Sequence, residues 1–132
     1  GIQTQVNKKL VLNVDLAPTM LDFAGVPIPS NMHGKSLRPL LQNETTPWRT
    51  SIFYEAPQPQ LGSWPLYAVR TERWKYIQTF DINNPQKLAF EELYDLQHDP
   101  HEVKNIVSQD KHKPMVQSLR NQLKNAKQKY ES

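Results

Sequence analysis

The run Lys-Leu-Val-Leu-Asn-Val at residues 9–14 constrains the fold of this chain more than any other feature. Its Leu-Val-Leu centre is continuously apolar, which is typical of a strand buried on both faces of a sheet. Such a strand needs neighbours, and only residues 51–55 have a similar character. We therefore expect residues 9–14 to form a strand of a larger α/β sheet whose other strands lie outside the chain.

A short amphipathic helix is predicted directly after this strand. Asp15 suits the N-cap, where its carboxylate would accept the N–H groups two and three residues on, and Pro18 fits the first turn. Gly25 and Pro27 then end the helix. The apolar positions fall on one helix face: Leu16, Met20, Phe23 and Ala24. Capping explains Asp15 without a bound metal.

The middle of the chain is rich in proline and is predicted to be mostly irregular. Residues 36–41 favour a helical turn interrupted by Pro39, and residues 49–56 favour a second strand. Residues 57–65 contain three prolines and a glycine and therefore predict a loop.

The last part of the chain predicts a small antiparallel sheet covered by a helix. Residues 67–71 and 74–79 alternate as in a hairpin, and residues 91–96 would add a third strand. A helix is expected from Pro114 onwards, because apolar residues recur at steps of three and four: Val116, Leu119, Leu123, Ala126 and Tyr130. This stripe would dock on the sheet.

The formal charge of +3 is concentrated near the C-terminal end. The basic residues there are Lys111, Lys113, Arg120, Lys124, Lys127 and Lys129. A basic face could attract nucleic acid, an anionic membrane or a sulfated polymer. It matches no nucleic-acid motif, so we interpret it as a solvated helix face and expect no nucleic-acid partner. No apolar run approaches the ~18 residues of a spanning helix, so no membrane partner is expected.

Four phrases stand out along the chain: Val-Asp-Leu-Ala-Pro-Thr-Met-Leu-Asp-Phe-Ala-Gly at 14–25, His-Gly-Lys-Ser-Leu at 33–37, Ala-Val-Arg-Thr-Glu-Arg-Trp-Lys-Tyr at 68–76 and Glu-Leu-Tyr-Asp-Leu-Gln-His-Asp-Pro-His-Glu-Val-Lys-Asn at 92–105. In this order they resemble the C-terminal third of type I sulfatases, the formylglycine-dependent hydrolases of sulfate esters.

The resemblance implies an α/β fragment. Residues 1–56 would be the C-terminal edge (last strand, helix and strand) of the large alkaline-phosphatase-like domain. Residues 57–66 would be a variable loop, and residues 67–132 a small α+β domain with an antiparallel sheet and a C-terminal helix.

The resemblance also implies that the reacting groups lie elsewhere. The family makes its nucleophile from the Cys of a Cys-x-Pro-x-Arg run, and this chain has no Cys. The parent is expected to use calcium and a formylglycine and to be periplasmic or secreted. This chain would lack catalytic and metal-binding residues and would be inactive alone. Its partner would be a missing N-terminal catalytic portion, whose fold it completes and whose substrate cleft it lines, with a sulfated glycan as substrate.

Trp64, Tyr67 and Arg70 are the candidate substrate-binding residues. Aromatic rings stack on the apolar faces of sugars, and a guanidinium binds sulfate oxygens with two hydrogen bonds. The alternative is a structural role for the rings and a solvated Arg70.

Other short patterns have structural explanations. His-Gly-Lys-Ser at 33–36 lacks the first Gly of a phosphate-binding loop, so it predicts a turn. His101-Glu102 lacks the second His of a zinc motif, so we predict no metal and assign Asp99 as the cap of a turn. Asn43-Glu44-Thr45 fits an N-glycosylation site.

Two other functions remain open at this stage. The chain could be a stand-alone carbohydrate-binding or interaction module, or the tail of a related phosphonate or phosphodiester hydrolase, because a scaffold does not fix its chemistry.

Overall fold

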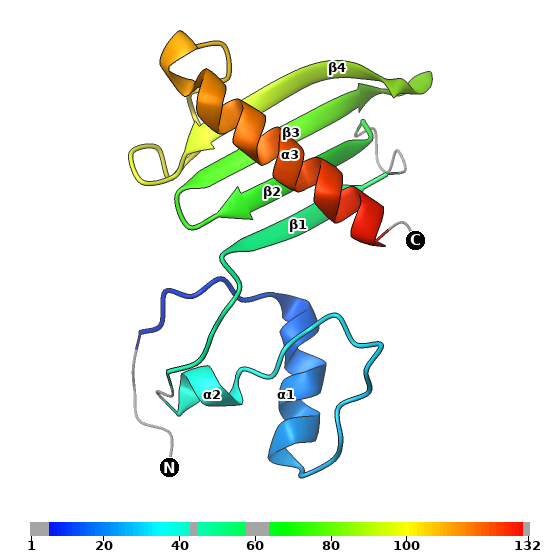
Figure 1. Ribbon diagram of the computed structural model, residues 1–132, viewed down its shortest axis with the longest axis vertical. Coiled ribbons are helices and arrows are strands. Elements are labelled where there is room, and N and C mark those ends of the chain that lie inside the picture. Colours follow the sequence, from blue (N-terminus) through cyan, green and yellow to red (C-terminus); the bar gives the residue numbers. More distant parts are fainter. Residues whose placement is uncertain (1–5, 43–44, 58–63, 131–132) are drawn as a thin grey trace. The chain divides into compact units, whose positions relative to one another are not determined.

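The computed structural model describes residues 6–42, 45–57 and 64–130 (Figure 1). The chain divides into two compact units, Gly1–Arg49 and Thr50–Ser132, which we call the first and the second unit. Among the described residues, no helix combines the length and the apolar character that crossing a bilayer requires. Asn43, and residues 58–63 of the predicted variable loop, lie outside the described residues.

The first unit is built from short helices. The 3-10 helix η1 (Asn13–Asp15) leads directly into α1 (Leu16–Phe23), and α2 (Arg38–Leu41) follows after a long loop. The predicted end of α1 is confirmed, because Gly25 has a left-handed φ of 69°, which a residue without Cβ adopts freely. Pro39 lies at the start of α2, where proline is tolerated, so it begins this helix rather than interrupting it.

The strand predicted at residues 9–14 is wrong. Residues 9–12 have no regular structure, and residues 13–15 form η1. Asp15 closes this turn, because its N–H donates to the carbonyl of Leu12 at 3.1 Å and its Oδ2 accepts the N–H of Leu12 at 2.8 Å. Within its described residues the first unit has no strand that could pair with this segment. Val11 and Val14 are consequently about half exposed, at 51% and 48%.

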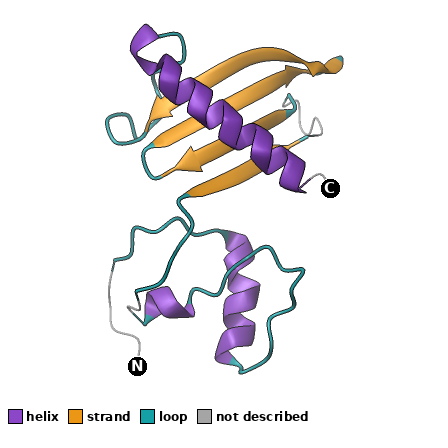
Figure 2. Ribbon diagram, in the orientation of Figure 1, coloured by secondary structure: helices purple, strands orange, loops and turns teal. Residues whose placement is uncertain are grey.

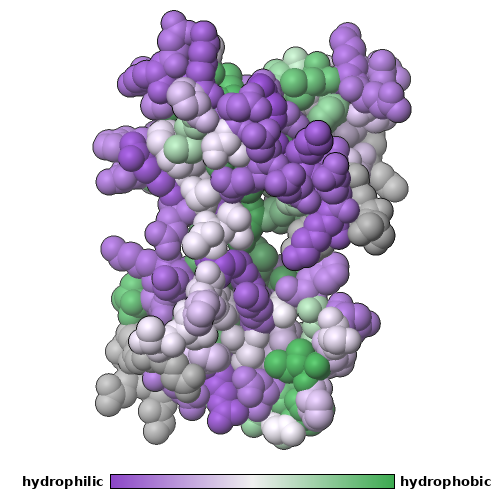
Figure 3. Space-filling model, viewed as in Figure 1, coloured by the Kyte–Doolittle hydropathy of each residue, from purple (hydrophilic) through white to green (hydrophobic). Residues whose placement is uncertain are grey.

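The apolar face predicted for α1 is largely exposed in the first unit. Leu16, Met20 and Phe23 are 53%, 70% and 49% exposed, whereas the buried residues of α1 are Pro18 and Thr19. Figure 3 shows hydrophobic surface over this part of the chain. The helix is therefore confirmed, but its apolar stripe is only partly covered: the Arg38 guanidinium lies 5.6 Å from the Phe23 ring centroid.

The second unit is a four-stranded antiparallel sheet with a helix on one face (Figure 2). Its strands follow in sequence order: β1 (Ser51–Ala56), β2 (Leu66–Thr71), β3 (Trp74–Asp81) and β4 (Asn84–Asp95). The helix α3 (Lys113–Tyr130) follows the 3-10 helix η2 (Asp110–His112) and crosses the sheet. The predicted small α+β domain is thus confirmed. β4 begins earlier than expected and pairs with the end of β3 through irregular register near Phe80.

The strand predicted at residues 49–56 exists, but it does not belong with the first unit. Ser51–Ala56 pairs antiparallel with β2 and forms an edge of the small sheet. The register places Phe53 opposite Val69, and both side chains pack on the same core. This apolar pairing draws the strand into the second unit, so the compact units divide at residues 49 and 50.

The core of the second unit lies between the sheet and α3. Its buried members are Val69, Tyr76, Leu93, Val116, Leu119 and Leu123. Leu119 and Leu123 are each only 1% exposed, which confirms the predicted docking of the helix through its apolar stripe.

Candidate functional site

The structure does not gather Trp64, Tyr67 and Arg70 into one site. Tyr67 packs on the side of the sheet that carries α3, with its ring centroid 6.4 Å from that of Phe53 and 5.7 Å from that of Phe80. Arg70 is exposed, and strand alternation directs it to the opposite face from Tyr67. A single ligand could therefore not contact both side chains across the sheet.

Trp64 has a different neighbour. Its ring centroid lies 6.3 Å from that of Phe90 in a tilted arrangement, and the two residues are 41% and 50% exposed. Arg70 is six positions further along the chain, which corresponds to roughly 20 Å of extended backbone. Trp64 and Phe90 thus form an exposed aromatic pair of the kind that can stack on a sugar.

Asp15 is the centre of a buried polar clamp in the first unit. Its side chain is 0% exposed and accepts hydrogen bonds from Arg49 Nη1 and Nη2 at 2.5 and 2.7 Å, and from the N–H of Lys35 at 2.9 Å. Burial alone would raise the pKa of Asp15, but the hydrogen bonds from Arg49, Lys35 and Leu12 outweigh it, so the pKa is lowered. The carboxylate does not bind the N–H groups of α1, so the predicted capping contact is wrong.

The backbone around Asp15 requires a glycine at position 34. A Cβ at position 34 would lie 2.0 Å from the carbonyl oxygen of Val14, so the chain can pass here only as glycine. The next residues are fixed by α1: Thr19 Oγ1 accepts the N–H of Leu37 at 2.8 Å, and Ser36 Oγ donates to Asp22 at 2.5 Å. The predicted turn at 33–36 is not formed: the segment only bends, at Gly34 and Leu37, and its hydrogen bonds dock it on the helix.

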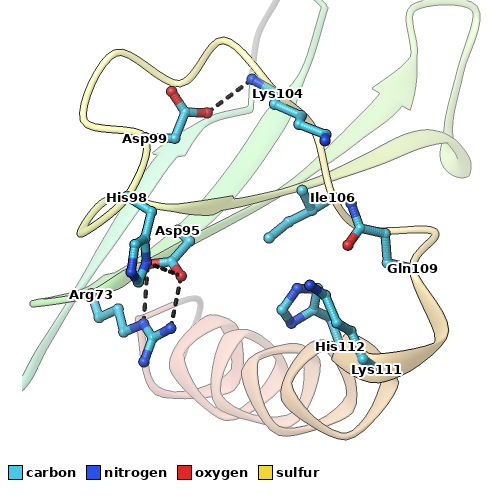
Figure 4. Close-up of a pocket in the computed structure, with 9 residues that line it drawn as sticks. All are labelled: Arg73, Asp95, His98, Asp99, Lys104, Ile106, Gln109, Lys111 and His112. Carbon is cyan, nitrogen blue, oxygen red and sulfur yellow. Dashed lines mark hydrogen bonds and ion pairs between the residues drawn. The ribbon is translucent and has the colours of Figure 1, made fainter.

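A second set of polar contacts lines a pocket of about 440 Å³ in the second unit (Figure 4). Asp95, at the end of β4, accepts two hydrogen bonds from Arg73 at 3.0 and 2.8 Å and contacts His98 Nδ1 at 3.0 Å. The Arg73 guanidinium holds the pKa of Asp95 well below its usual range, with a smaller contribution from His98. Asp95 is therefore an ionised structural acceptor rather than a proton donor.

Hydrogen bonds from its own polar residues stabilise the loop after β4 and hold it to that strand. Asp99 accepts the N–H groups of Val103 and Lys104 at 3.0 and 2.9 Å, so it caps a turn, although no helix follows. Asn105 accepts the N–H of Leu93 at 3.0 Å and donates to the carbonyl of Glu91 at 3.0 Å. No short-range pattern predicts these contacts, because Asn105 pairs with residues 12 and 14 positions away.

A third polar cluster lies under α3. Tyr76 donates to Glu91, and Glu91 also accepts hydrogen bonds from Arg120 Nη2 at 3.0 and 2.9 Å. Burial and the neighbouring Glu91 raise the pKa of Tyr76 to about 12. The phenol therefore stays protonated and serves as a donor. The aromatic and acidic residues here hold the sheet to the helix.

The basic helix face is not simply solvated, so that interpretation needs correction. Arg120 forms the ion pair with Glu91, and Lys127 Nζ lies 3.5 Å from the ring centroid of Tyr67. Lys124 remains exposed, as expected. Position on the helix explains the difference, because Arg120 and Lys127 stand beside the buried stripe and their long side chains reach the sheet from there.

The described residues contain no group of three or more His, Cys, Asp or Glu side chains that could hold a metal ion. The most strongly held carboxylates, Asp15 and Asp95, are each paired with an arginine. Pairing with arginine lowers the pKa of both carboxylates, so each is a weak base at neutral pH.

The second unit is an antiparallel sheet covered by a helix, and polar clamps fix the loops of both units. The family model of N-sulphoglucosamine sulphohydrolase, C-terminal, matches residues 2–129. The chain belongs to this family and corresponds to the C-terminal portion of a sulfatase of the alkaline-phosphatase-like superfamily, as the resemblance predicted.

The relatives are sulfatases of bacteria and animals. The chain is 36% identical to an N-acetylglucosamine-6-O-sulfatase of Bacteroides thetaiotaomicron, with 90% of this chain and 21% of that protein covered. It is 37% identical to arylsulfatase K of Rattus norvegicus, with 76% of this chain and 18% of that protein covered. The chain thus spans about a fifth of the length of these relatives.

Solved structures agree with the fold. A protein in complex with its substrate D-glucosamine-2-N,6-O-disulfate matches with a TM-score of 0.76 and 33% identity, covering 90% of this chain and 24% of that one. A phosphonate monoester hydrolase of Agrobacterium radiobacter matches with a TM-score of 0.67 and 22% identity, covering 87% and 24%. At that identity the second likeness concerns the fold alone.

Proposed function

We propose that the whole protein is a sulfuric ester hydrolase that acts on sulfated carbohydrate, and that this chain supplies structure and substrate contacts to it. The observation that carries the proposal is the family match over residues 2–129 together with sulfatase relatives at 36% and 37% identity. The names of two similar proteins support the substrate class, since one is an N-acetylglucosamine-6-O-sulfatase and the other binds a disulfated glucosamine.

The reacting groups are assigned to a catalytic portion that precedes this chain in the whole protein. The family's formylglycine requires a Cys, and this chain has none. The described residues also offer no calcium ligand set. We therefore assign both the formylglycine and calcium to that N-terminal portion, and we propose a periplasmic or secreted location for the protein, as in the family. The stand-alone module and the phosphonate hydrolase tail are not favoured.

Trp64 is our candidate for the substrate contact at the edge of the cleft. It is partly exposed beside Phe90, which is what a sugar-stacking ring requires. Arg70 is exposed and would reach an anionic group of a longer substrate. Tyr67 packs under Lys127, so in this proposal it supports the sheet and contacts sugar only at its open edge.

Sulfate release tests the proposed activity directly. The whole protein should hydrolyse a sulfated glucosamine oligosaccharide, whereas the 132-residue chain should release no sulfate from it or from nitrocatechol sulfate, with or without calcium. Metal-dependent turnover by the purified chain would refute the assignment of the chemistry to the preceding portion. An inactive whole protein with an intact Cys-x-Pro-x-Arg run would refute the sulfatase proposal.

The contact role has its own test in the whole protein. Trp64→Ala should raise KM for a sulfated oligosaccharide and leave a small aryl sulfate nearly unchanged, because the small substrate does not reach the ring. Tyr54→Ala is the matched control, since Tyr54 is an aromatic residue of the same sheet that is 60% exposed. Equal effects of Trp64→Ala on both substrates would give Trp64 a structural role instead.

A further inference from the structure

A groove of about 360 Å³ runs along α3 where the helix passes over β3. Its lining side chains are amides and cations: Gln78, Arg120, Lys124, Lys127 and Gln128. The four helix residues are spaced by four, three and one positions, so they project from one side of the helix. Figure 3 shows a mostly hydrophilic surface over the second unit on this side. The volume lies near the lower end of the about 300–1,000 Å³ that ligand pockets occupy.

The charge of the groove is positive. None of the described acidic side chains lines it. Arg120 is paired with Glu91 behind the groove. Lys124 and Lys127 add two further cationic side chains to the lining, and each ammonium group carries hydrogen-bond donors and no acceptor. Gln78 and Gln128 add neutral amide donors to the same wall.

Two of the cations are held in place before any ligand arrives. Lys127 Nζ lies 3.5 Å from the ring centroid of Tyr67 and 5.3 Å from that of Phe80, positions that favour a cation–π interaction. Arg120 is fixed by Glu91 and by a 3.3 Å hydrogen bond from its Nε to the Tyr76 hydroxyl. Preorganised donors lose less side-chain entropy when they bind an anion than free ones do.

We propose that this groove binds a sulfate group of a sulfated polysaccharide, with Lys124 and Lys127 as its charged ligands and the two glutamines as neutral donors. The choice of polymer rests on the proposed function, whereas the preference for an anion rests on the groove itself. A single-stranded nucleic acid fits less well, because its bases need open aromatic faces. The faces of Tyr67 and Phe80 are instead shared with Lys127.

The test is a titration of the 132-residue chain with a heparin hexasaccharide, followed by calorimetry and by amide chemical shifts. The comparison ligand is the same hexasaccharide after desulfation and N-acetylation. The expected shifts cluster at residues 120–128 and at Gln78, and binding weakens as salt rises, since exposed charges are screened. The desulfated ligand should bind at least about tenfold more weakly, because it lacks the charge-assisted hydrogen bonds.

Paired variants separate a site from general attraction. Lys124→Gln combined with Lys127→Gln should weaken hexasaccharide binding about tenfold. Lys111→Gln combined with Lys113→Gln removes the same charge outside the groove and should change binding less than about twofold. Lys124→Gln alone guards against a folding defect, because Lys124 is exposed and makes none of the ring contacts of Lys127. Thermal unfolding of each variant accompanies the titration.

Three results would overturn the proposal: no binding of the hexasaccharide by the chain, equal losses in the two double variants, or equally tight binding of an oligonucleotide of the same charge. The last result would assign the groove to nucleic acid or to anions in general. Failure here leaves the proposed activity standing, because sulfate release by the whole protein is measured separately and does not depend on this groove.

Discussion

The two units of this chain are stabilised in different ways. The second unit buries an apolar core in which Tyr76 and Leu93 are 0% exposed and Leu119 and Leu123 are 1% exposed. In the described part of the first unit, the charged Asp15 is 0% exposed, and large apolar residues face outward. Those outward residues are Val6, Val11, Val14, Leu16, Met20, Phe23, Val26 and Ile28. One unit is held by packing, and the other is held by a polar clamp.

This difference in stabilisation explains what the sequence runs that resemble sulfatases contribute in each unit. In the second unit, Asp95, Asp99 and Asn105 fasten loops to a sheet that is already packed. In the first unit, the clamp at Asp15 joins α1, the segment near Gly34 and Arg49. Exposed apolar surface around such a clamp is typical of an interface. We therefore expect the first unit to gain most of its apolar burial from the catalytic portion of the whole protein.

The largest effect is expected from Asp15→Asn. Removing one partner of a buried ion pair usually costs about 3–5 kcal/mol, because the other charge is left uncompensated. Arg49 would be that charge, and its side chain is only 13% exposed. The indole N–H of Trp48, which donates to the carbonyl of Leu10 at 2.7 Å, gives a resolved NMR reporter for the first unit. Its resonance should move toward that of a free indole.

Asp22→Asn is the control for that prediction. Asp22 forms an ion pair with Arg38 in the same unit, but the two side chains are 29% and 42% exposed. Water can replace the lost contact, so the effect should be clearly smaller. If the two substitutions perturb Trp48 equally, the Asp15 clamp has no special role and the comparison fails for the first unit.

Shortening a core side chain should destabilise the second unit about as strongly as Asp15→Asn destabilises the first. Leu119→Ala is expected to cost about 2–5 kcal/mol, because it removes a buried leucine and leaves a cavity under α3. Lys124→Ala on the exposed side of the same helix should cost less than about 0.5 kcal/mol. Thermal unfolding followed by circular dichroism measures both. Equal and negligible shifts would show that α3 is not docked on the sheet.

The Arg73–Asp95 ion pair predicts that the unfolding free energy of the chain depends on pH. The folded-state pKa of Asp95 is lowered by Arg73, so the folded protein binds this proton less readily than the unfolded chain, whose Asp pKa is about 3.9. The stabilisation is therefore present above about pH 4 and is lost as the pH falls toward the folded-state pKa. Asp95→Asn should cost about 1–2 kcal/mol at neutral pH, since Arg73 is half exposed and the pair is partly solvated.

Urea unfolding over a series of pH values tests this linkage. The difference in unfolding free energy between the unmodified chain and Asp95→Asn should be constant near neutrality and shrink below about pH 4. A difference that does not change down to about pH 2 would mean that the carboxylate charge is not what holds the turn.

The smallest effect is expected at the outward face of α1. Met20→Gln should change the unfolding free energy of this chain by less than about 0.5 kcal/mol, because Met20 is 70% exposed. In the whole protein the same change should cost more, if the catalytic portion covers this face. A large loss in the 132-residue chain, measured by the Trp48 resonance, would show that Met20 is already buried in solution.

Local signals in the sequence predicted much of this fold. The C-terminal end of α1, the hairpin of β2 and β3 and the docking of α3 follow from a glycine stop, alternation and a three-and-four spacing, all of which act between near neighbours. The polar clamps could not be predicted, because Asp15 pairs with Arg49 34 positions away and Arg120 pairs with Glu91 29 positions away. No short-range pattern encodes such a pairing.

The wrong prediction of a strand at residues 9–14 has a similar origin. A continuous apolar run predicts a buried strand only when partner strands exist, and the described first unit contains none for residues 9–14. The assignment of Trp64, Tyr67 and Arg70 as substrate contacts stays a prediction, and the fold only constrains how they could act together. Residues 67 and 70 of a strand point to opposite faces, so β2 separates two of these side chains.

Amide hydrogen exchange of the 132-residue chain tests the central contrast most directly. Exchange reports local opening, so protection should follow the apolar core. We predict the slowest exchange in β3, β4 and α3, around Tyr76, Leu93 and Leu119, and much faster exchange in α1 around Met20. Protection in α1 equal to that in β3 would contradict the account, because the first unit would then be as stably folded by its polar clamp as the second unit is by its core.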